Sequence, residues 1–299
     1  MKKQTTILFL VLIAGIITLN SKAQSPGSGN QPMPAAISAE NGSSLGAQKK
    51  GDFFLTPFYE FSSFKKLELI SHTNHYKLWQ GESSYDFTSD EIQEYNDNFD
   101  TEYNNSMTGI KVGYQAMEGL GISGYLGVNH VNFKSFISDE NTQTINTNNP
   151  ALTLGLAVDY KKAINDKFAA MALVSYNYCT TGSVAVDNTS GEDVTSSGLK
   201  SMYYEVNLVL AYHYKKLQPY IGVGFTQQFV NSVHEEKILT TNDSGNEVFN
   251  YTEFDSHFRG SAIYGIAGLD YCFNKNLAMY VRSSFPNPVR ANLGLRIVL

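Results

Sequence analysis

Asp255, Ser256 and His257 form a short pattern that could carry acid–base chemistry. Residues two apart in a strand face the same side, so the carboxylate of Asp255 and the imidazole of His257 would lie together. A carboxylate that orients a histidine can assist peptide hydrolysis, and Asp97 or Asp100 could supply a second carboxylate. A pattern this short arises easily by chance, and the G-x-S-x-G elbow of serine hydrolases is absent. We therefore expect no enzyme and assign no catalytic residue.

The segment 64–106 combines acidic and aromatic side chains. It could bind a cationic partner, a sugar or a divalent ion, or it could be a solvated loop that repels anionic surface molecules, which is the interpretation we favour. It lacks the ligand period and glycine of an EF-hand, and no Cys/His spacing matches a zinc site, so we expect no metal and no cofactor. Its acidic residues are Glu68, Glu82, Asp86, Asp90, Glu91, Glu94, Asp97, Asp100 and Glu102, and its aromatic residues include Tyr76, Trp79, Tyr85, Tyr95 and Tyr103.

Seven ionisable residues interrupt stretches in which every second residue is apolar. They are Lys111, Asp159, Glu205, His213, Asp270, Arg282 and Arg296. If the apolar face meets lipid, these side chains share an interior, where the two signs of charge can neutralise one another. Such a charge network could line an ion or solute path. More often it fills the interior and fixes the strand register, and we favour that interpretation.

The elements that position these residues are strands. From Gly51 onward, apolar and polar residues alternate in segments of about ten, the length of a tilted membrane strand. The apolar positions of these segments carry no charged residue, and the charges fall on the alternate positions. An apolar outer face with inward charges is the reverse of a soluble sheet, whose charges point outward. The clearest segments are 110–116, 120–128, 152–160, 168–178, 202–214, 221–229, 263–273, 277–281 and 293–299, with an additional first strand at 53–61 whose register is uncertain.

The connections between these segments alternate in length. Short turns at 117–119, 163–166, 215–218 and 274–276 alternate with long polar connections at 64–106, 132–150, 180–200 and 231–256. Tyrosines before the short turns predict an aromatic girdle there, and both features are typical of outer-membrane barrels with long outer loops. We therefore predict an all-β fold, a closed antiparallel up-and-down transmembrane β-barrel of ten strands, with eight strands as the alternative.

The N-terminal residues predict export. Lys2 and Lys3 precede an apolar run from Ile7 to Leu19, and small residues flank a cleavage position after about Ala23. We expect a signal peptide at 1–23, a flexible leader at 24–50, and an outer-membrane β-barrel at 51–299. The net charge is −6 and no basic cluster suggests a nucleic-acid surface, so we expect no nucleic-acid partner. Two cysteines, Cys179 and Cys272, fall near opposite ends of the predicted barrel, so we expect free thiols.

The end of the chain carries a family resemblance. Residues 277–282 and 291–299 alternate apolar and polar residues up to the C-terminus, and this pair resembles the closing hairpin of small outer-membrane β-barrel proteins. The final residue is Leu299, where that family usually has an aromatic residue. The resemblance implies outer-membrane lipid as the environment and recognition of the C-terminal strand by the barrel-assembly machinery.

The predicted function follows from the interior and the loops. Five tyrosines fall on the inward face (Tyr125, Tyr203, Tyr220, Tyr264 and Tyr280) and indicate a narrow or plugged lumen. We expect a surface protein for binding or adhesion, or for envelope structure, with a possible extracellular ligand on the long loops. One alternative is a narrow solute channel. The second is a rim protease like the omptins, ten-stranded outer-membrane proteases that use acidic residues and a histidine, although the rest of the chain does not resemble them.

Overall fold

The computed structural model describes residues 51–78, 81–117, 119–138, 141–147, 151–165, 167–181, 184–188, 194–241, 245, 247–274 and 276–299. The expected signal peptide at 1–23 and the expected leader at 24–50 lie outside the described residues, so both stay predictions. Within the described residues, no helix is long and apolar enough to cross a membrane.

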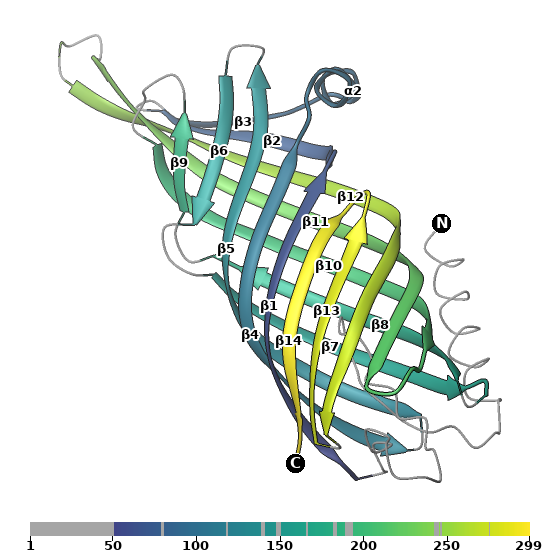
Figure 1. Ribbon diagram of the computed structural model, residues 1–299. Coiled ribbons are helices and arrows are strands. Elements are labelled where there is room, and N and C mark those ends of the chain that lie inside the picture. The colour runs from purple at the N-terminus through teal and green to yellow at the C-terminus, as the bar shows by residue number, and fades with distance from the viewer. Residues whose placement is uncertain are drawn as a thin grey trace.

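Ten antiparallel strands close into a barrel (Figure 1). Each pairs with the next one along the chain, and β1 pairs with β14 to close the ring. Closure lets every strand satisfy its backbone groups on both edges, which hydrocarbon requires. The prediction of a ten-stranded barrel is therefore confirmed, and the eight-stranded alternative is wrong. The strands are β1 (Phe53–Lys65), β4 (Glu102–Met117), β5 (Leu120–Ser138), β7 (Ala151–Ala163), β8 (Phe168–Thr180), β10 (Val194–Tyr212), β11 (Leu217–Thr241), β12 (Glu247–Asn274), β13 (Leu277–Phe285) and β14 (Val289–Val298).

The two faces of the wall differ as the alternation predicts. Leu156 is 65% exposed and Ile263 is 77% exposed on the outside. On the inside, Asp159 and Asp270 are buried. Since exposed apolar surface on this scale is stable only in an apolar solvent, the outer face is the lipid face.

Aromatic pairs lie at both rims of this face. At the end that carries the short turns, the Phe168 and Tyr212 ring centroids lie 5.1 Å apart. At the other end, Tyr176 and Tyr204 lie 5.2 Å apart. Both termini of the described chain lie at the short-turn end, which in such barrels is the periplasmic end.

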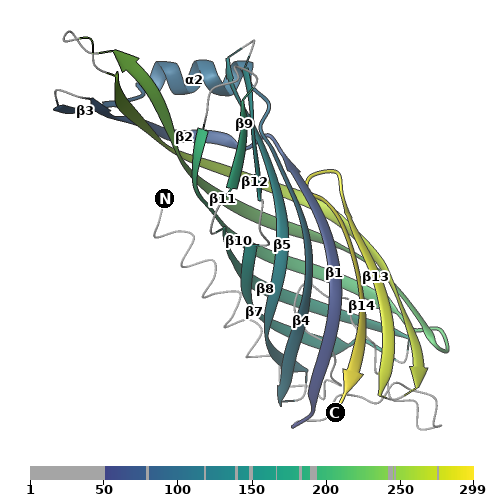
Figure 2. The same ribbon diagram turned by 90° about the vertical axis from the view of Figure 1, so that its left-hand side faces the viewer.

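The long connections correct one prediction, because much of what we expected to be polar loop continues as strand. The strands β11 and β12 pair from Leu217↔Tyr271 as far as Thr241↔Glu247 and project beyond the barrel (Figure 2). Antiparallel pairing needs only a partner strand and not an apolar face, so the hairpin persists in water. The further outer elements are β2 (Glu68–Leu78), β3 (Gly81–Asp86), α2 (Ser89–Asn98), β6 (Asn141–Thr147) and β9 (Val184–Asn188).

The chain after β1 crosses above the β13–β14 hairpin. Lys66 adopts a left-handed backbone with φ 63°, and the chain then enters β2. The strand β2 pairs with the outer part of β12, from Arg259↔Glu68 to Tyr251↔Lys77. Because the β13–β14 hairpin is short, the outer part of β12 pairs with β2 instead of β13. The helix α2 lies beyond β2, at the outer end of the molecule (Figure 2).

Candidate functional site

The structure gathers most of the predicted charges inside the barrel. Six of the seven lie on the inner face and are buried: Lys111, Asp159, Glu205, Asp270, Arg282 and Arg296. His213 follows the end of β10 and is only half-buried at the periplasmic rim, where its backbone N–H donates to the carbonyl of Lys167 at 2.7 Å. The inward side chains that the structure describes form charged and apolar layers along the barrel axis.

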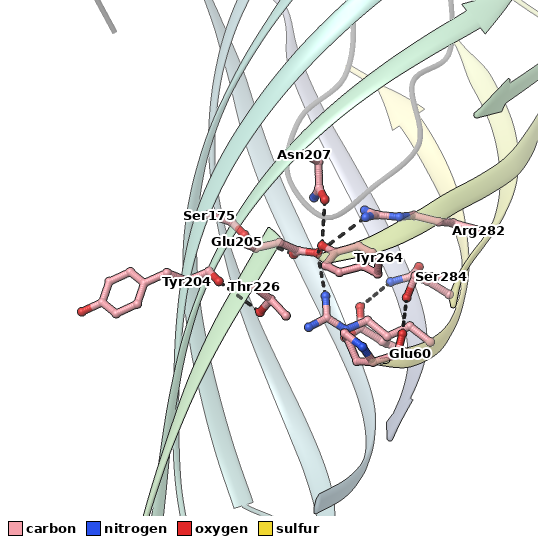
Figure 3. A network of polar contacts seen from close by, with 12 residues as sticks. Glu60, Ser175, Tyr204, Glu205, Asn207, Thr226, Tyr264, Arg282 and Ser284 are labelled. Atoms are coloured by element: carbon pink, nitrogen blue, oxygen red, sulfur yellow. Dashed lines mark hydrogen bonds and ion pairs between the residues drawn. The ribbon is translucent and has the colours of Figure 1, made fainter. Parts of the chain in front are cut away.

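Glu205 on β10 is the centre of a middle layer, the charged layer (Figure 3). Arg290 Nη1 donates to Glu205 Oε1 at 2.6 Å, and Arg282 Nη2 lies 3.6 Å from the same oxygen. The hydroxyl of Tyr264 donates to it as well. All three partners come from β12, β13 and β14, so the contacts span the interior rather than neighbouring strands.

Glu60 on β1 is the second carboxylate of the charged layer. Asn292 Nδ2 donates to Glu60 Oε2 at 2.7 Å, and the Glu60 side chain is buried. Two carboxylates therefore face two guanidinium groups, and their formal charges cancel. We missed Glu60 because the first strand is apolar on both faces. We did not predict Arg290 because residues 284–290 were expected to form a turn. Counting back from Arg296 in steps of two residues would have placed Arg290 on the inner face.

A second group of charges lies nearer the periplasmic rim. Lys111 interacts electrostatically with Asp159, Lys161 interacts with Asp270, and Arg296 interacts with both carboxylates. Asp159 and Asp270 accept no hydrogen bond from the described residues, so the nearby cations compensate their burial. Lys161 was missed because the predicted strand ended one residue earlier.

An apolar layer closes the barrel above these charges. The Phe133 ring on β5 and the Phe258 ring on β12 lie 5.0 Å apart, although these strands are on opposite sides of the ring of ten. Ile92 and Tyr95 of α2 pack onto this layer from outside. We missed it because most of its residues fall where we expected polar loops. The layer consists of Phe64, Leu67, Leu69, Tyr103, Val131, Phe133, Ala151, Cys179, Leu199, Val230 and Phe258, contributed by eight of the barrel strands, the β1–β2 turn and β2.

Tyrosine rings fill much of the remaining interior. Four of the five tyrosines predicted to face inward are buried, and Arg290 lies over the fifth, Tyr203, at 5.2 Å. Each of the four rings covers a glycine, where a Cβ atom would collide with the ring; the pairs are Tyr125–Gly155, Tyr220–Gly268, Tyr264–Gly224 and Tyr280–Gly294. Alternation of large and absent side chains on adjacent strands is how a narrow barrel packs its interior.

The Asp255–His257 pair lies outside this interior. Asp255 Oδ1 and His257 Nε2 are 3.3 Å apart, and both side chains are partly exposed on the outward face of β12. Ser256 lies on the opposite, inward face, with its Oγ 2.7 Å from Nδ1 of His72, a contact that the sequence did not indicate. Burial lowers the pKa of His72, so its imidazole is neutral at neutral pH. Within the described residues, no group of three or more histidine, cysteine or acidic side chains could hold a metal ion.

The two cysteines are free and buried at opposite ends of the interior. Cys179 lies in the apolar layer, where its Sγ accepts from Asn129 Nδ2 at 3.3 Å. Cys272 packs against Ala278 near the periplasmic rim. The prediction of free thiols is confirmed.

Comparison with known proteins identifies a family for this chain. The sequence model of the autotransporter beta-domain matches residues 80–284. The translocator domain of the autotransporter NalP from Neisseria meningitidis matches at 7% identity and a TM-score of 0.39, over 82% of this chain and 88% of that one. The outer-membrane protease OmpT from Escherichia coli matches at 10% identity and a TM-score of 0.40, over 83% and 97% of the two chains. A search of curated proteins finds no match.

Proposed function

Because the chain belongs to the autotransporter beta-domain family of outer-membrane barrels, we propose that it is a closed barrel that presents its outer elements for binding at the cell surface. The observation that supports this most is the apolar layer, in which side chains from opposite walls meet. Because the lumen is filled at this depth, the elements outside the membrane are the part of the molecule that would bind a ligand. These are β2, β3, α2 and the outer part of the β11–β12 hairpin.

A channel or translocator function would need a continuous path. The apolar layer excludes water, and beneath it Glu205 is bound to Arg282 and Arg290 rather than lining an open passage. Moving a solute or a polypeptide through this barrel would require both layers to leave the interior. The Asp255–His257 pair faces away from the interior, and this arrangement gives no enclosed site for the rim-protease alternative.

The closed state is tested by planar-bilayer recording of the purified protein in molar potassium chloride. We expect no stable conductance, while a general-diffusion porin reconstituted in parallel gives steps of nanosiemens. Stable steps of that size from the wild-type protein would overturn the proposal and favour the channel.

The helix α2 is the strongest candidate for the binding surface. Its exposed residues Asp90, Glu94 and Asp97 lie on a helix with no basic residue in its last turn. A capping box between Thr88 and Glu91 fixes its first turn. A cationic ligand would therefore meet a rigid, negatively charged surface rather than a mobile chain.

Vesicles that carry the protein should retain fluorescent oligolysine, and Asp90→Asn/Glu94→Gln/Asp97→Asn should lower this retention several-fold. The matched control Glu82→Gln/Glu235→Gln/Glu253→Gln removes the same charge from the outer strands and should retain most of the binding. If wild-type vesicles retain no more oligolysine than protein-free vesicles, α2 is not a site for cationic ligands.

A further inference from the structure

A groove lies on the lipid face next to the periplasmic rim, across β7, β8, β10 and β11. Its volume is about 660 Å³, and apolar side chains line most of it. Ala170 and Ala172 on β8 form its floor, because they are the short side chains between larger neighbours. The pairing Lys162↔Ala170↔Leu210↔Ile221 forms one row across it, and Tyr160↔Ala172↔Leu208↔Val223 forms the next.

Lysines gather where this groove reaches the rim. Lys162 lines the groove and faces outward, at the end of a row of lipid-facing residues on β7. Lys167 in the β7–β8 turn and Lys215 and Lys216 in the β10–β11 turn are exposed. The two turns are in contact, because the His213 N–H donates to the Lys167 carbonyl.

This basic cluster contrasts with the rest of the chain. The protein carries a net charge of −6, yet the end of β7 holds Lys162 and the two turns hold Lys167, Lys215 and Lys216. Asp166, which lies outside the described residues, is the acidic residue that accompanies them in the sequence. A local positive field at a membrane surface attracts anionic headgroups, and a lysine at the end of a lipid-facing row extends its ammonium toward them.

We propose that this groove binds one anionic phospholipid of the periplasmic leaflet. An acyl chain lies over Ala170 and Ala172, between the larger side chains of β7 and β10. The phosphate lies among the ammonium groups of Lys162, Lys167 and Lys215. The aromatic girdle formed by Tyr212 and Phe168 fixes the depth of the rim, so the headgroup and the lysines are at the same level.

A second groove on the same barrel provides an internal comparison. It lies across β4, β5, β7 and β8, has a volume of about 850 Å³, and is also apolar. Its polar edge consists of Tyr176 and Tyr178, and no lysine lines it. Shape alone would favour lipid in both grooves, whereas the lysines favour an anionic lipid in the first.

Native mass spectrometry of the detergent-solubilised protein tests the proposal. Phosphatidylglycerol and phosphatidylethanolamine are added in equal amounts, and the retained lipid is counted. The charge variant is Lys162→Gln/Lys167→Gln/Lys215→Gln, and its control, Lys65→Gln/Lys66→Gln/Lys77→Gln, removes three charges at the opposite end. The groove variant is Ala170→Leu/Ala172→Leu, and its control, Gly124→Leu, fills the second groove, where an added Cβ has ordinary contacts.

We expect the wild type to retain one phosphatidylglycerol in preference to phosphatidylethanolamine. The charge variant should lose this preference, the groove variant should retain several-fold less phosphatidylglycerol, and both controls should retain as much phosphatidylglycerol as the wild type. A heat-dependent shift in gel mobility shows that each variant is folded. Equal retention of the two lipids by the wild type, or unchanged phosphatidylglycerol in the charge or groove variant, would overturn the proposal.

Discussion

Asn287, in the turn between β13 and β14, forms a two-way hydrogen-bonded pair with the backbone of Lys65, the last residue of β1. Its Nδ2 donates to the Lys65 carbonyl at 2.9 Å, and its Oδ1 accepts from the Lys65 N–H at 3.1 Å. The side chain replaces a strand partner at the point where β1 leaves the wall and turns toward β2. The β13–β14 turn thus anchors the segment between β1 and β2 where it crosses above this hairpin.

We expect Asn287→Ala to lower the free energy of unfolding by about 1 kcal/mol, since two partly solvated hydrogen bonds are lost. Urea titration of the protein in detergent measures this through the fluorescence of Trp79, the single tryptophan of the sequence. Ser83→Ala on the exposed strand β3 is the control. An unchanged midpoint in Asn287→Ala would show that the pair does not hold the crossing.

Removing the contact at the centre of the apolar layer should open the outer end of the lumen. Each of Phe133→Ala and Phe258→Ala is expected to cost about 3–5 kcal/mol, because each leaves a cavity in a packed interior. Cys179 in the same layer reports the opening, with Cys272 replaced by alanine. In the Cys272→Ala background, the Phe133→Ala/Phe258→Ala variant should react with a membrane-impermeant maleimide many-fold faster than the parent, which carries Cys272→Ala alone. The control Phe225→Ala on the lipid face should react as slowly as this parent. A fast reaction in the parent would mean that the layer is already open.

Glu205 neutralises two guanidinium groups in the interior, so its loss should be severe. Glu205→Gln leaves Arg282 and Arg290 without their shared carboxylate, and we expect a loss of about 3–5 kcal/mol in stability. Arg282→Gln should cost less, because Glu205 keeps the shorter contact with Arg290. The temperature of the heat-dependent gel shift ranks the variants, with Glu94→Gln as the exposed control. Equal shifts for Glu205→Gln and Glu94→Gln would contradict this ranking.

The start of α2 should loosen in acid. Hydrogen bonds from the Tyr85 hydroxyl, at 2.6 Å, and from the Thr88 backbone and hydroxyl hold the pKa of Glu91 below its usual range. A lowered pKa means that the ionised form stabilises the folded state. This contribution is complete above the ordinary pKa of glutamic acid and is lost as the pH falls through the lowered value.

Hydrogen exchange of the first-turn amides measures this effect, after correction for the intrinsic pH dependence of exchange. Protection should fall over the acidic range in the wild type, whereas in Glu91→Gln it should be low and independent of pH. Protection that is independent of pH in the wild type would show that the Glu91 carboxylate does not stabilise this turn.

Predictions from the sequence were correct where a local rule determines the structure. The two faces of β7 follow from residues 152–160 alone, because a period of two and a lipid solvent fix which side each residue takes. The predictions failed at 231–241 and 247–256, which belong to the predicted loop 231–256 but form strands, because strand pairing there depends on a partner strand and not on an apolar face. They also failed at Glu60, since β1 is apolar on both faces and only pairing with β4 and β14 fixes its register.

The amino-acid order by itself determined the strand number, the lipid face and the end with short turns, because all three follow from alternation and from connection length. Only the tertiary structure decided what fills the lumen. Phe133 meets Phe258, and Arg290 meets Glu205, from strands that lie apart in both the sequence and the sheet. Such contacts depend on the closure and diameter of the barrel, and these arise when all ten strands pair at once rather than within any single strand.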